Sequence, residues 1–320
     1  MFEAIVFIIV GMFLLIKGAD FLVDGASNVA KKFHIPEIII GLTIVSIGTS
    51  MPELFVSLTS ALEGYSDMAV GNIVGSNISN LLLILGMSAI IRNIRFRRET
   101  IYIEIPLCLT ITALFWFLAN TNAGISRGEG IFLLVLCTMF IIYTIIMARK
   151  GNKFNKENDE NASKEKDLPK KSVLKDIIYV IGGIVALKFG GDLVVDNAVL
   201  IAELFNWSEK LISVTILAIG TSLPELVTSV SAAIKGKSDI ALGNVLGSNI
   251  FNILLIIGVS AVIKPITYNL SYNTDMIFLI IATSMLALFP IIPPKCRVSR
   301  SNGVAYILMY VGYLATTILK

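Results

Sequence analysis

GTSMPEL at residues 48–54 and GTSLPEL at residues 220–226 are two copies of one motif. A second motif follows each of them, GNIVGSNISN at 71–80 and GNVLGSNIFN at 243–252. The copies are offset by 172 residues throughout, and 21 of the 37 aligned positions that span both motifs are identical. The chain therefore contains an internal duplication, and the pattern of these motifs decides its architecture.

Each copy carries one glutamate, Glu53 or Glu225, inside an otherwise apolar run. The chain of 320 residues is 55% hydrophobic and only 15% charged, with a mean hydropathy of +0.82. This composition is typical of integral membrane proteins. Because an acid inside a bilayer is costly and usually marks an ion or substrate pathway, the duplicated glutamates predict a binding site.

Ten runs are long enough to cross a bilayer, which takes roughly 20 apolar residues per helix. They span residues 2–29, 37–62, 68–91, 99–119, 129–148, 173–199, 209–234, 240–263, 274–290 and 302–319. The first run lacks a basic segment ahead of it, so we expect it to be retained rather than cleaved as a signal peptide. The predicted fold class is an all-α integral membrane protein with ten transmembrane helices.

Lysine and arginine are distributed unevenly between the two sets of alternating loops. One set carries 20 basic residues and the other carries four. The basic set comprises Lys31, Lys32, Arg92, Arg95, Arg97, Arg98, nine residues within 149–175, Lys235, Lys237, Lys295, Arg297 and Arg300. Because cytoplasmic loops carry the excess of positive charge, both termini are predicted outside and the long central loop inside.

Residues 150–172 form a polar segment of mixed charge without apolar periodicity. It predicts a flexible cytoplasmic linker between residues 1–149 and residues 173–320. Each flanking part holds five predicted helices, and an odd number gives the second part the opposite orientation in the membrane. Similar sequence with opposite topology predicts two inverted five-helix repeats, an architecture of many transporters.

The first motif offers a set of oxygen ligands around a helix break. Pro52 has no N–H, and its ring crowds the carbonyl of Gly48, so the helix is expected to break there. Thr49, Ser50 and Glu53 surround the break. The second copy repeats the set with Gly220, Thr221, Ser222, Pro224 and Glu225. Hard cations such as calcium and sodium prefer oxygen ligands, so these groups predict a cation site.

The second motif is expected to form the partner helix. Asn72, Ser76 and Asn80 follow one another at intervals of four residues, so they lie on one helical face. The second copy repeats them as Asn244, Ser248 and Asn252. Small residues four apart, which allow close helix packing, occur at Gly71, Gly75, Gly243 and Gly247. Ser76, Asn80, Ser248 and Asn252 are predicted ion ligands, whereas Asn72, Asn77, Asn244 and Asn249 could simply bond neighbouring helices.

The charge of the predicted site suggests coupled transport. Two desolvated carboxylates repel each other, and burial costs several kcal/mol per ion. One divalent cation, or at least two monovalent cations, would neutralise the pair. A carrier that changes conformation readily only when it is loaded is predicted to exchange ions rather than to conduct one kind alone.

These paired motifs resemble the repeated segments of the sodium/calcium exchanger family, in the cation/calcium exchanger superfamily. The chain is most similar to the short prokaryotic members, which have ten helices and no large regulatory domain. The resemblance implies a plasma-membrane antiporter that extrudes calcium against entering sodium by alternating access. It also implies that the first and sixth helices slide across the core, and that the bound partners are calcium and sodium ions without a cofactor.

The resemblance further implies roles for individual residues. Glu53 and Glu225 would bridge calcium, and the carbonyls of Thr49 and Thr221 would complete its site. Ser50 and Ser76 would serve one sodium site, and Ser222 and Ser248 would serve its mirror image. The backbone carbonyls of Ser46 and Ala218 would add to the sodium sites. Asn80 and Asn252 would lie at the centre of the ion cluster. Many family members carry aspartate where this chain has Asn252, so two carboxylates rather than three are expected here. That difference argues against potassium co-transport.

Two other transport functions stay open at this point. A proton/calcium antiporter, or one for another divalent cation, could neutralise the same carboxylates with protons, but its branch resembles a pattern with an acid where this chain has Ser76 and Ser248. A cation channel could also use oxygen-lined broken helices. An enzyme is not expected, because no HExxH or GxSxG motif occurs. The three cysteines show no metal or disulfide spacing. No nucleic-acid partner is expected, and the chain is predicted to function as a monomer in the lipid bilayer.

Overall fold

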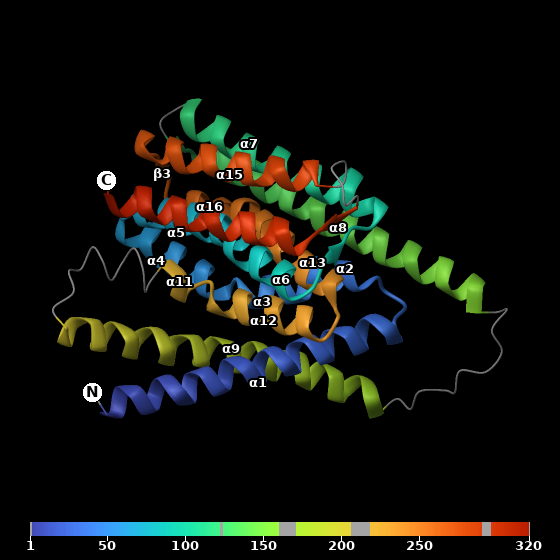
Figure 1. Cartoon of the computed structure of the whole chain (residues 1–320). Coiled ribbons are helices and arrows are strands. Elements are labelled where there is room, and N and C mark those ends of the chain that lie inside the picture. The colour runs from blue at the N-terminus through green and yellow to red at the C-terminus, as the bar shows by residue number, and fades with distance from the viewer. Residues whose placement is uncertain (1, 122–123, 160–170, 206–217, 290–295, 320) are drawn as a thin grey trace.

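The protein forms a bundle of long helices (Figure 1). The structure is a computed structural model that describes residues 2–121, 124–159, 171–205, 218–289 and 296–319. Within these ranges the strands are only two residues long, so the fold is all-helical as predicted.

The helices of the first part follow the predicted spans closely. They are α1 (Phe2–Lys32), α2 (Glu37–Ile40), α3 (Ser46–Thr49), α4 (Met51–Glu63), α5 (Ser66–Ser79), α6 (Leu85–Ile91), α7 (Ile105–Thr121) and α8 (Arg127–Asp159). Wider π-helical turns join several of them: η1 (Gly41–Val45), η2 (Asn80–Ile84) and η3 (Thr100–Glu104). The segment Ser66–Ile91 is therefore one long helix with a π-helical turn inside it.

The second part repeats this order. Its helices are α9 (Lys171–Leu204), α11 (Ala218–Gly220), α12 (Leu223–Ile234), α13 (Ser238–Phe251), α14 (Gly258–Ile263), α15 (Asn273–Leu288) and α16 (Arg300–Leu319). A π-helical turn, η5 (Asn252–Ile257), joins α13 to α14, and a 3₁₀ turn, η6 (Leu270–Tyr272), precedes α15. Residues 209–217 of the predicted seventh span lie outside the described residues.

Two short antiparallel ladders connect the halves of the chain. β1 (Ile94–Arg95) pairs with β4 (Arg297–Val298), and β2 (Gly124–Ile125) pairs with β3 (Ile266–Thr267). The first residues of β1 and β3 are 172 positions apart, like the two copies of the motifs. The offset of 172 residues between equivalent positions is thus also found in the loops that contain β1 and β3, although the sequences of these loops differ.

Seven described helices are long and apolar enough to cross a membrane by length and composition. An eighth is counted if α2–α3 and α4, which meet at a bend of 49°, form one broken span. Two helices are buried far more than the others: 78% of the apolar window is buried in Ser66–Ile91 and also in Ser238–Ile263. These equivalent helices therefore form the centre of the bundle, and the remaining spans surround them.

α1 and α9 lie together along one side of the bundle (Figure 1). Glycines bring their backbones close: a Cβ added at Gly11 would lie 2.8 Å from the Gly190 carbonyl oxygen, and one at Gly183 would lie 2.7 Å from that of Gly18. Small residues at such crossings allow close backbone packing. The first and sixth predicted helices consequently form one closely packed pair.

Helix α8 extends ten residues into the segment predicted as a linker. Residues 150–159 are helical, because α8 continues to Asp159. Nucleation is the costly step of helix formation, so a helix that is already formed extends readily through polar residues without proline. α9 begins at Lys171, and residues 160–170 lie outside the described part of the chain.

Candidate cation-binding site

Each GTSxPE motif contains the predicted break in its helix. α3 ends at Thr49, and α4 begins at Met51 with Pro52 in its first turn. Ser50 between them has φ −83° and ψ 11°, and Ser222 in the second copy has φ −87° and ψ 6°. Proline fits the first turn of a helix because the N–H that it lacks has no partner there anyway. The two breaks therefore adopt the same local geometry.

The two glutamates project from the first turns of α4 and α12 into the protein interior. Glu53 and Glu225 are each only 1% exposed. Ser50 donates a hydrogen bond of 2.8 Å to Glu225 Oε1. Ser222 and Ser76 approach Glu53 Oε1 at 3.5 and 3.4 Å. Each carboxylate thus accepts a hydroxyl from the break in the other copy, so the two motifs build a single site.

Four of the candidate ligand oxygens are buried and have no hydrogen-bond partner among the described residues. They are Glu53 Oε2, Glu225 Oε2, Asn80 Oδ1 and Asn252 Oδ1. An unsatisfied buried polar group costs about 1–3 kcal/mol, so protein interiors rarely tolerate one without a reason. The four form two equivalent pairs of one charged and one neutral oxygen, which are the ligand types that calcium and sodium prefer.

The site contains few charges. No group of three or more His, Cys, Asp and Glu residues that could hold a metal occurs in the described ranges. The candidate ligands among the described residues are two carboxylates together with neutral oxygens. Such a set suits hard cations rather than metals that prefer nitrogen or sulfur ligands.

The threonine hydroxyls hold the breaks against the partner helices. Thr49 Oγ1 donates to Asn244 Oδ1 at 3.0 Å, and Thr221 Oγ1 approaches Asn72 Oδ1 at 3.5 Å. The Asn72 amide in turn donates to Ser57 Oγ at 3.0 Å. The Asn244 amide donates in the same way to Ser229 Oγ at 3.0 Å. Asn72 and Asn244 therefore bond neighbouring helices, one of the two roles left open by the sequence.

The serines contact one another across the two copies. Ser50 Oγ lies 2.9 Å from Ser248 Oγ. Ser76 and Ser222 both approach Glu53 Oε1, so all four serines that the resemblance implies as sodium ligands lie near a carboxylate or another of these serines. Ser46 is fully buried in η1–α3.

Two further candidate groups complete the predicted set. Ser46 donates its hydroxyl to the Thr43 carbonyl at 3.1 Å. Ala218 is the first described residue of α11, which places its backbone just ahead of the second break. Both residues thus lie in the helical segment just before a break.

Asn77 and Asn249 lock the two central helices together. Each donates its amide to the other's backbone carbonyl at 3.3 Å. Asn80 donates to Asn249 Oδ1 at 3.0 Å, and Asn252 donates to Asn77 Oδ1 at 2.9 Å. The side-chain amino groups of Asn80 and Asn252 are used in these bonds. Their side-chain Oδ1 atoms are therefore the ones without a hydrogen-bond partner.

We expect Asn249→Leu to destabilise the protein by about 2 kcal/mol or more, because it leaves the buried Asn80 amide without its acceptor and removes one of the hydrogen bonds to the Asn77 carbonyl. Thermal unfolding in detergent measures the change. Asn197→Leu is the matched control, because among the described residues the Asn197 amide bonds the Leu193 carbonyl of its own helix and no other helix. Equal melting temperatures for the two variants would contradict the interpretation.

The π-helical turns at the site had no signal in the sequence. η2 begins at Asn80 and η5 begins at Asn252. Single π-helical turns within α-helices often lie at functional sites. Here they widen the two central helices at the residues that carry the unpaired amide oxygens.

The chain is similar to known proteins over nearly its whole length. The model of the sodium/calcium exchanger protein family matches residues 3–148 and 175–319. The chain is 38% identical over 317 residues to a putative antiporter, CaxA, of Alkalimonas amylolytica, covering 98% of each chain. It is 31% identical to the sodium/calcium exchanger MaX1 of Methanosarcina acetivorans, covering 96% of each.

A solved structure shares the whole fold. The sodium-calcium exchanger NCX_Mj, soaked with zero Na⁺ and Ca²⁺, superposes with a TM-score of 0.83 at 30% identity, and the match covers 98% of each chain. The family model also covers both copies of the two motifs. The chain therefore belongs to the sodium/calcium exchanger family of membrane antiporters, whose transported ions are sodium and calcium.

Proposed function

We propose that this antiporter extrudes calcium across the plasma membrane in exchange for entering sodium, using the buried cage around Glu53 and Glu225 by alternating access. The observation that carries the proposal is the set of four buried oxygens without partners, two of them from carboxylates. Calcium takes about 6–8 oxygen ligands, so backbone carbonyls at Thr49 and Thr221 would add to the set. The proposed sodium ligands are the hydroxyls of the serines in the two motifs and the backbone carbonyls of Ser46 and Ala218.

The charge of the cage supports coupled exchange. Calcium or two sodium ions would each neutralise the two carboxylates, whereas the empty cage keeps two buried negative charges. The empty form would therefore rarely pass through the closed intermediate. Exchange of one ion type for the other is the transport mode that avoids this costly state.

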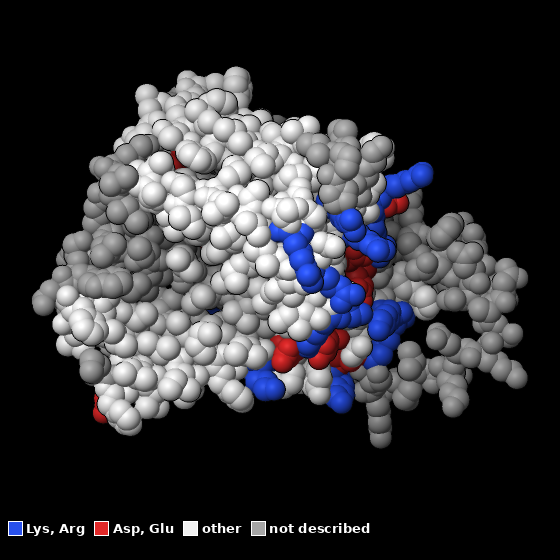
Figure 2. Space-filling view, in the orientation of Figure 1, with Lys and Arg blue, Asp and Glu red and all other residues white. Residues whose placement is uncertain are grey.

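The distribution of charge supports the proposed ten-helix, inverted topology. On the face drawn in Figure 2, lysines and arginines gather toward one end of the molecule. Both chain termini lie at the opposite end in the same orientation (Figure 1). Because basic loops stay on the cytoplasmic side, we infer that the termini are outside and the segment between the halves is inside. An even number of spans is required for this arrangement.

We infer that α1 and α9 move as one body across the core. The pair contacts the core through ion pairs of Lys235 with Asp20 at 3.0 Å and with Asp24 at 2.9 Å. Within the pair, Asn28 donates to Asp176 at 3.2 Å. Ion pairs at the moving boundary can exchange partners, whereas the glycine contacts within the pair leave no room for independent sliding.

Crosslinking tests this motion. A short, reducible thiol crosslinker between Asp20→Cys and Ser231→Cys, whose side chains are 3.0 Å apart, should slow exchange at least tenfold, and reduction should restore it. The control joins Asn28→Cys to Asp176→Cys within the pair and should leave exchange unchanged. Both variants need the three native cysteines replaced. A blocked control together with an active boundary crosslink would contradict the proposal.

Calcium flux in liposomes tests the function. Purified full-length protein, reconstituted alone, should take up calcium when a sodium gradient is imposed at clamped pH. Uptake driven only by a proton gradient would favour the proton/calcium antiporter. Flux that does not saturate and is not stimulated by calcium on the other side would favour a channel. Exchange at one chain per liposome would support a working monomer in the bilayer.

A further inference from the structure

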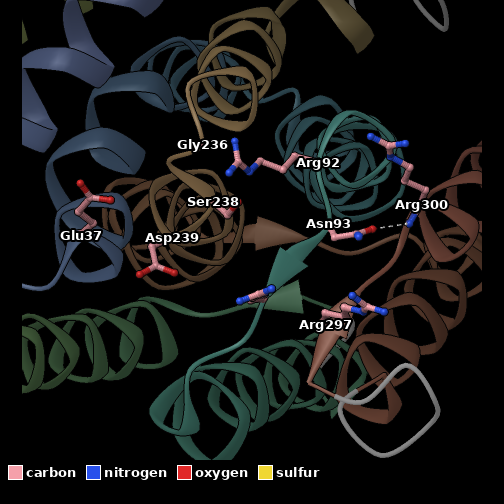
Figure 3. Close-up of a pocket in the computed structure, with 9 residues that line it drawn as sticks. Glu37, Arg92, Asn93, Gly236, Ser238, Asp239, Arg297 and Arg300 are labelled. Carbon is pink, nitrogen blue, oxygen red and sulfur yellow. Dashed lines mark hydrogen bonds between the residues drawn. The ribbon is translucent and has the colours of Figure 1, made fainter.

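A cavity at the basic end of the molecule is lined by four arginines. Its volume is about 530 Å³, which lies within the range of small-molecule sites. The arginines are Arg92, Arg95, Arg297 and Arg300, and the acids Glu37 and Asp239 also line the cavity. Figure 3 shows that labelled residues enter from separate segments, with Asn93 between Arg92 and Arg300. We propose that this cavity binds a phosphate-bearing anion, either a lipid headgroup or a soluble phosphate compound.

The acids that line the cavity are already neutralised from outside it. Arg97 contacts Asp239 with its Nε at 2.6 Å and with its Nη2 at 2.5 Å. Lys237 pairs with Glu37 at 2.9 Å. In the described ranges, no carboxylate pairs with Arg92, Arg95 or Arg297. Among the described residues, the guanidinium groups that face the cavity thus have no carboxylate counter-ion.

Two of these arginines are directly opposed in a ladder. Arg95 of β1 pairs with Arg297 of β4 in the antiparallel register. Like charges at directly opposed positions destabilise a strand pair. An anion between the two side chains would remove that repulsion and join the loop after α6 to the segment before α16.

The structure also positions Arg92 closely against the turn between α12 and α13. Gly236 in this turn has φ +77°, and a Cβ added there would lie 2.7 Å from Arg92 Nη1. Glycine therefore permits both the backbone conformation and the approach of the guanidinium group. Arg300 is positioned by two hydrogen bonds, from its backbone N–H to Asn93 Oδ1 at 3.1 Å and from its Nη2 to the Ile91 carbonyl at 3.4 Å. The surrounding turns thus place two of the four arginines at the cavity.

Arginine clusters favour phosphate because a planar guanidinium offers two parallel donors to phosphate oxygens. Basic loops alone are expected on the cytoplasmic side of any membrane protein. This cavity differs from an ordinary basic loop because four arginines line the same hollow. Basic pockets of this kind on the cytoplasmic side bind the headgroups of anionic lipids.

Ligand titration on delipidated full-length protein tests the proposal. The two probes are cardiolipin, followed by native mass spectrometry, and inorganic pyrophosphate, followed by calorimetry. We expect one of them to bind, and Arg92→Gln and Arg297→Gln each to weaken that binding about tenfold, because each removes a charge-assisted contact. Binding of cardiolipin identifies a lipid headgroup, and binding of pyrophosphate alone identifies a soluble ligand.

Arg98→Gln is the matched control, because Arg98 is exposed in the same loop and does not line the cavity. It should change the affinity less than twofold. Sodium-dependent calcium exchange in vesicles of zwitterionic lipid checks that each single variant is folded. Arg92→Lys, which keeps the charge but loses the paired donors, should bind with intermediate affinity. Failure of both probes to bind, or equal losses in Arg98→Gln and Arg92→Gln, would overturn the proposal.

Discussion

Sodium-dependent calcium exchange is expected to fall at least about a hundredfold in Glu53→Gln and in Glu225→Gln. Loss of about 3 kcal/mol of ion binding gives this factor. Glutamine keeps the shape of glutamate but removes the charge that balances the ion. Because the two carboxylates serve one cage, either substitution alone should have the full effect. The measurement is initial calcium uptake into sodium-loaded liposomes.

Glu104→Gln is the matched control for these variants. Glu104 is also a fully buried acid, but it lies in η3 and accepts a hydrogen bond from Tyr143 at 3.1 Å, away from both motifs. Its replacement should leave most of the exchange activity intact. Near-normal exchange in Glu53→Gln or Glu225→Gln would contradict the assignment of the site.

Gly243→Ala should clearly destabilise the protein. A Cβ at Gly243 would lie 2.6 Å from the Ile38 carbonyl oxygen and 2.8 Å from the Leu42 nitrogen. These contacts are with backbone, which cannot turn aside as a side chain can. Overpacking of this kind costs about 1–3 kcal/mol, and α2 must also move away from α13. Thermal unfolding of the purified protein measures the loss.

Gly182→Ala provides the comparison. Gly182 is exposed on α9, and no described atom lies within 4 Å of the position of an added Cβ. Alanine favours the helix over glycine by roughly 1 kcal/mol, so this variant should be as stable as the wild type or slightly more stable. A melting temperature for Gly243→Ala equal to that of Gly182→Ala would contradict the close packing inferred for α13.

The broken helices and their acids could be predicted from sequence because their causes are local. Proline and glycine in GTSxPE specify a break wherever the chain is helical, and the structure confirms it at Ser50 and Ser222. An acid in an apolar run must face other polar groups, so burial of Glu53 and Glu225 in the interior also followed from composition.

Other features depend on contacts between distant residues and had no local signal. The role of Asn77 and Asn249 depends on which face of α5 meets α13, and the sequence left that role open. The π-helical turns at Asn80 and Asn252 and the opposed Arg95 and Arg297 arise from packing between segments far apart in the chain. Helix α8 extends past its apolar stretch because helix growth tolerates polar residues.

Equilibrium calcium binding under sodium competition tests the central claim most directly, that one buried cage holds either calcium or sodium. Radioactive calcium should bind to the purified protein at one ion per chain. Sodium should displace it with a Hill coefficient above one, because at least two sodium ions are needed to balance both carboxylates. Glu53→Gln and Glu225→Gln should lose this binding. Calcium bound equally in either variant, or bound calcium that sodium does not displace, would contradict the account.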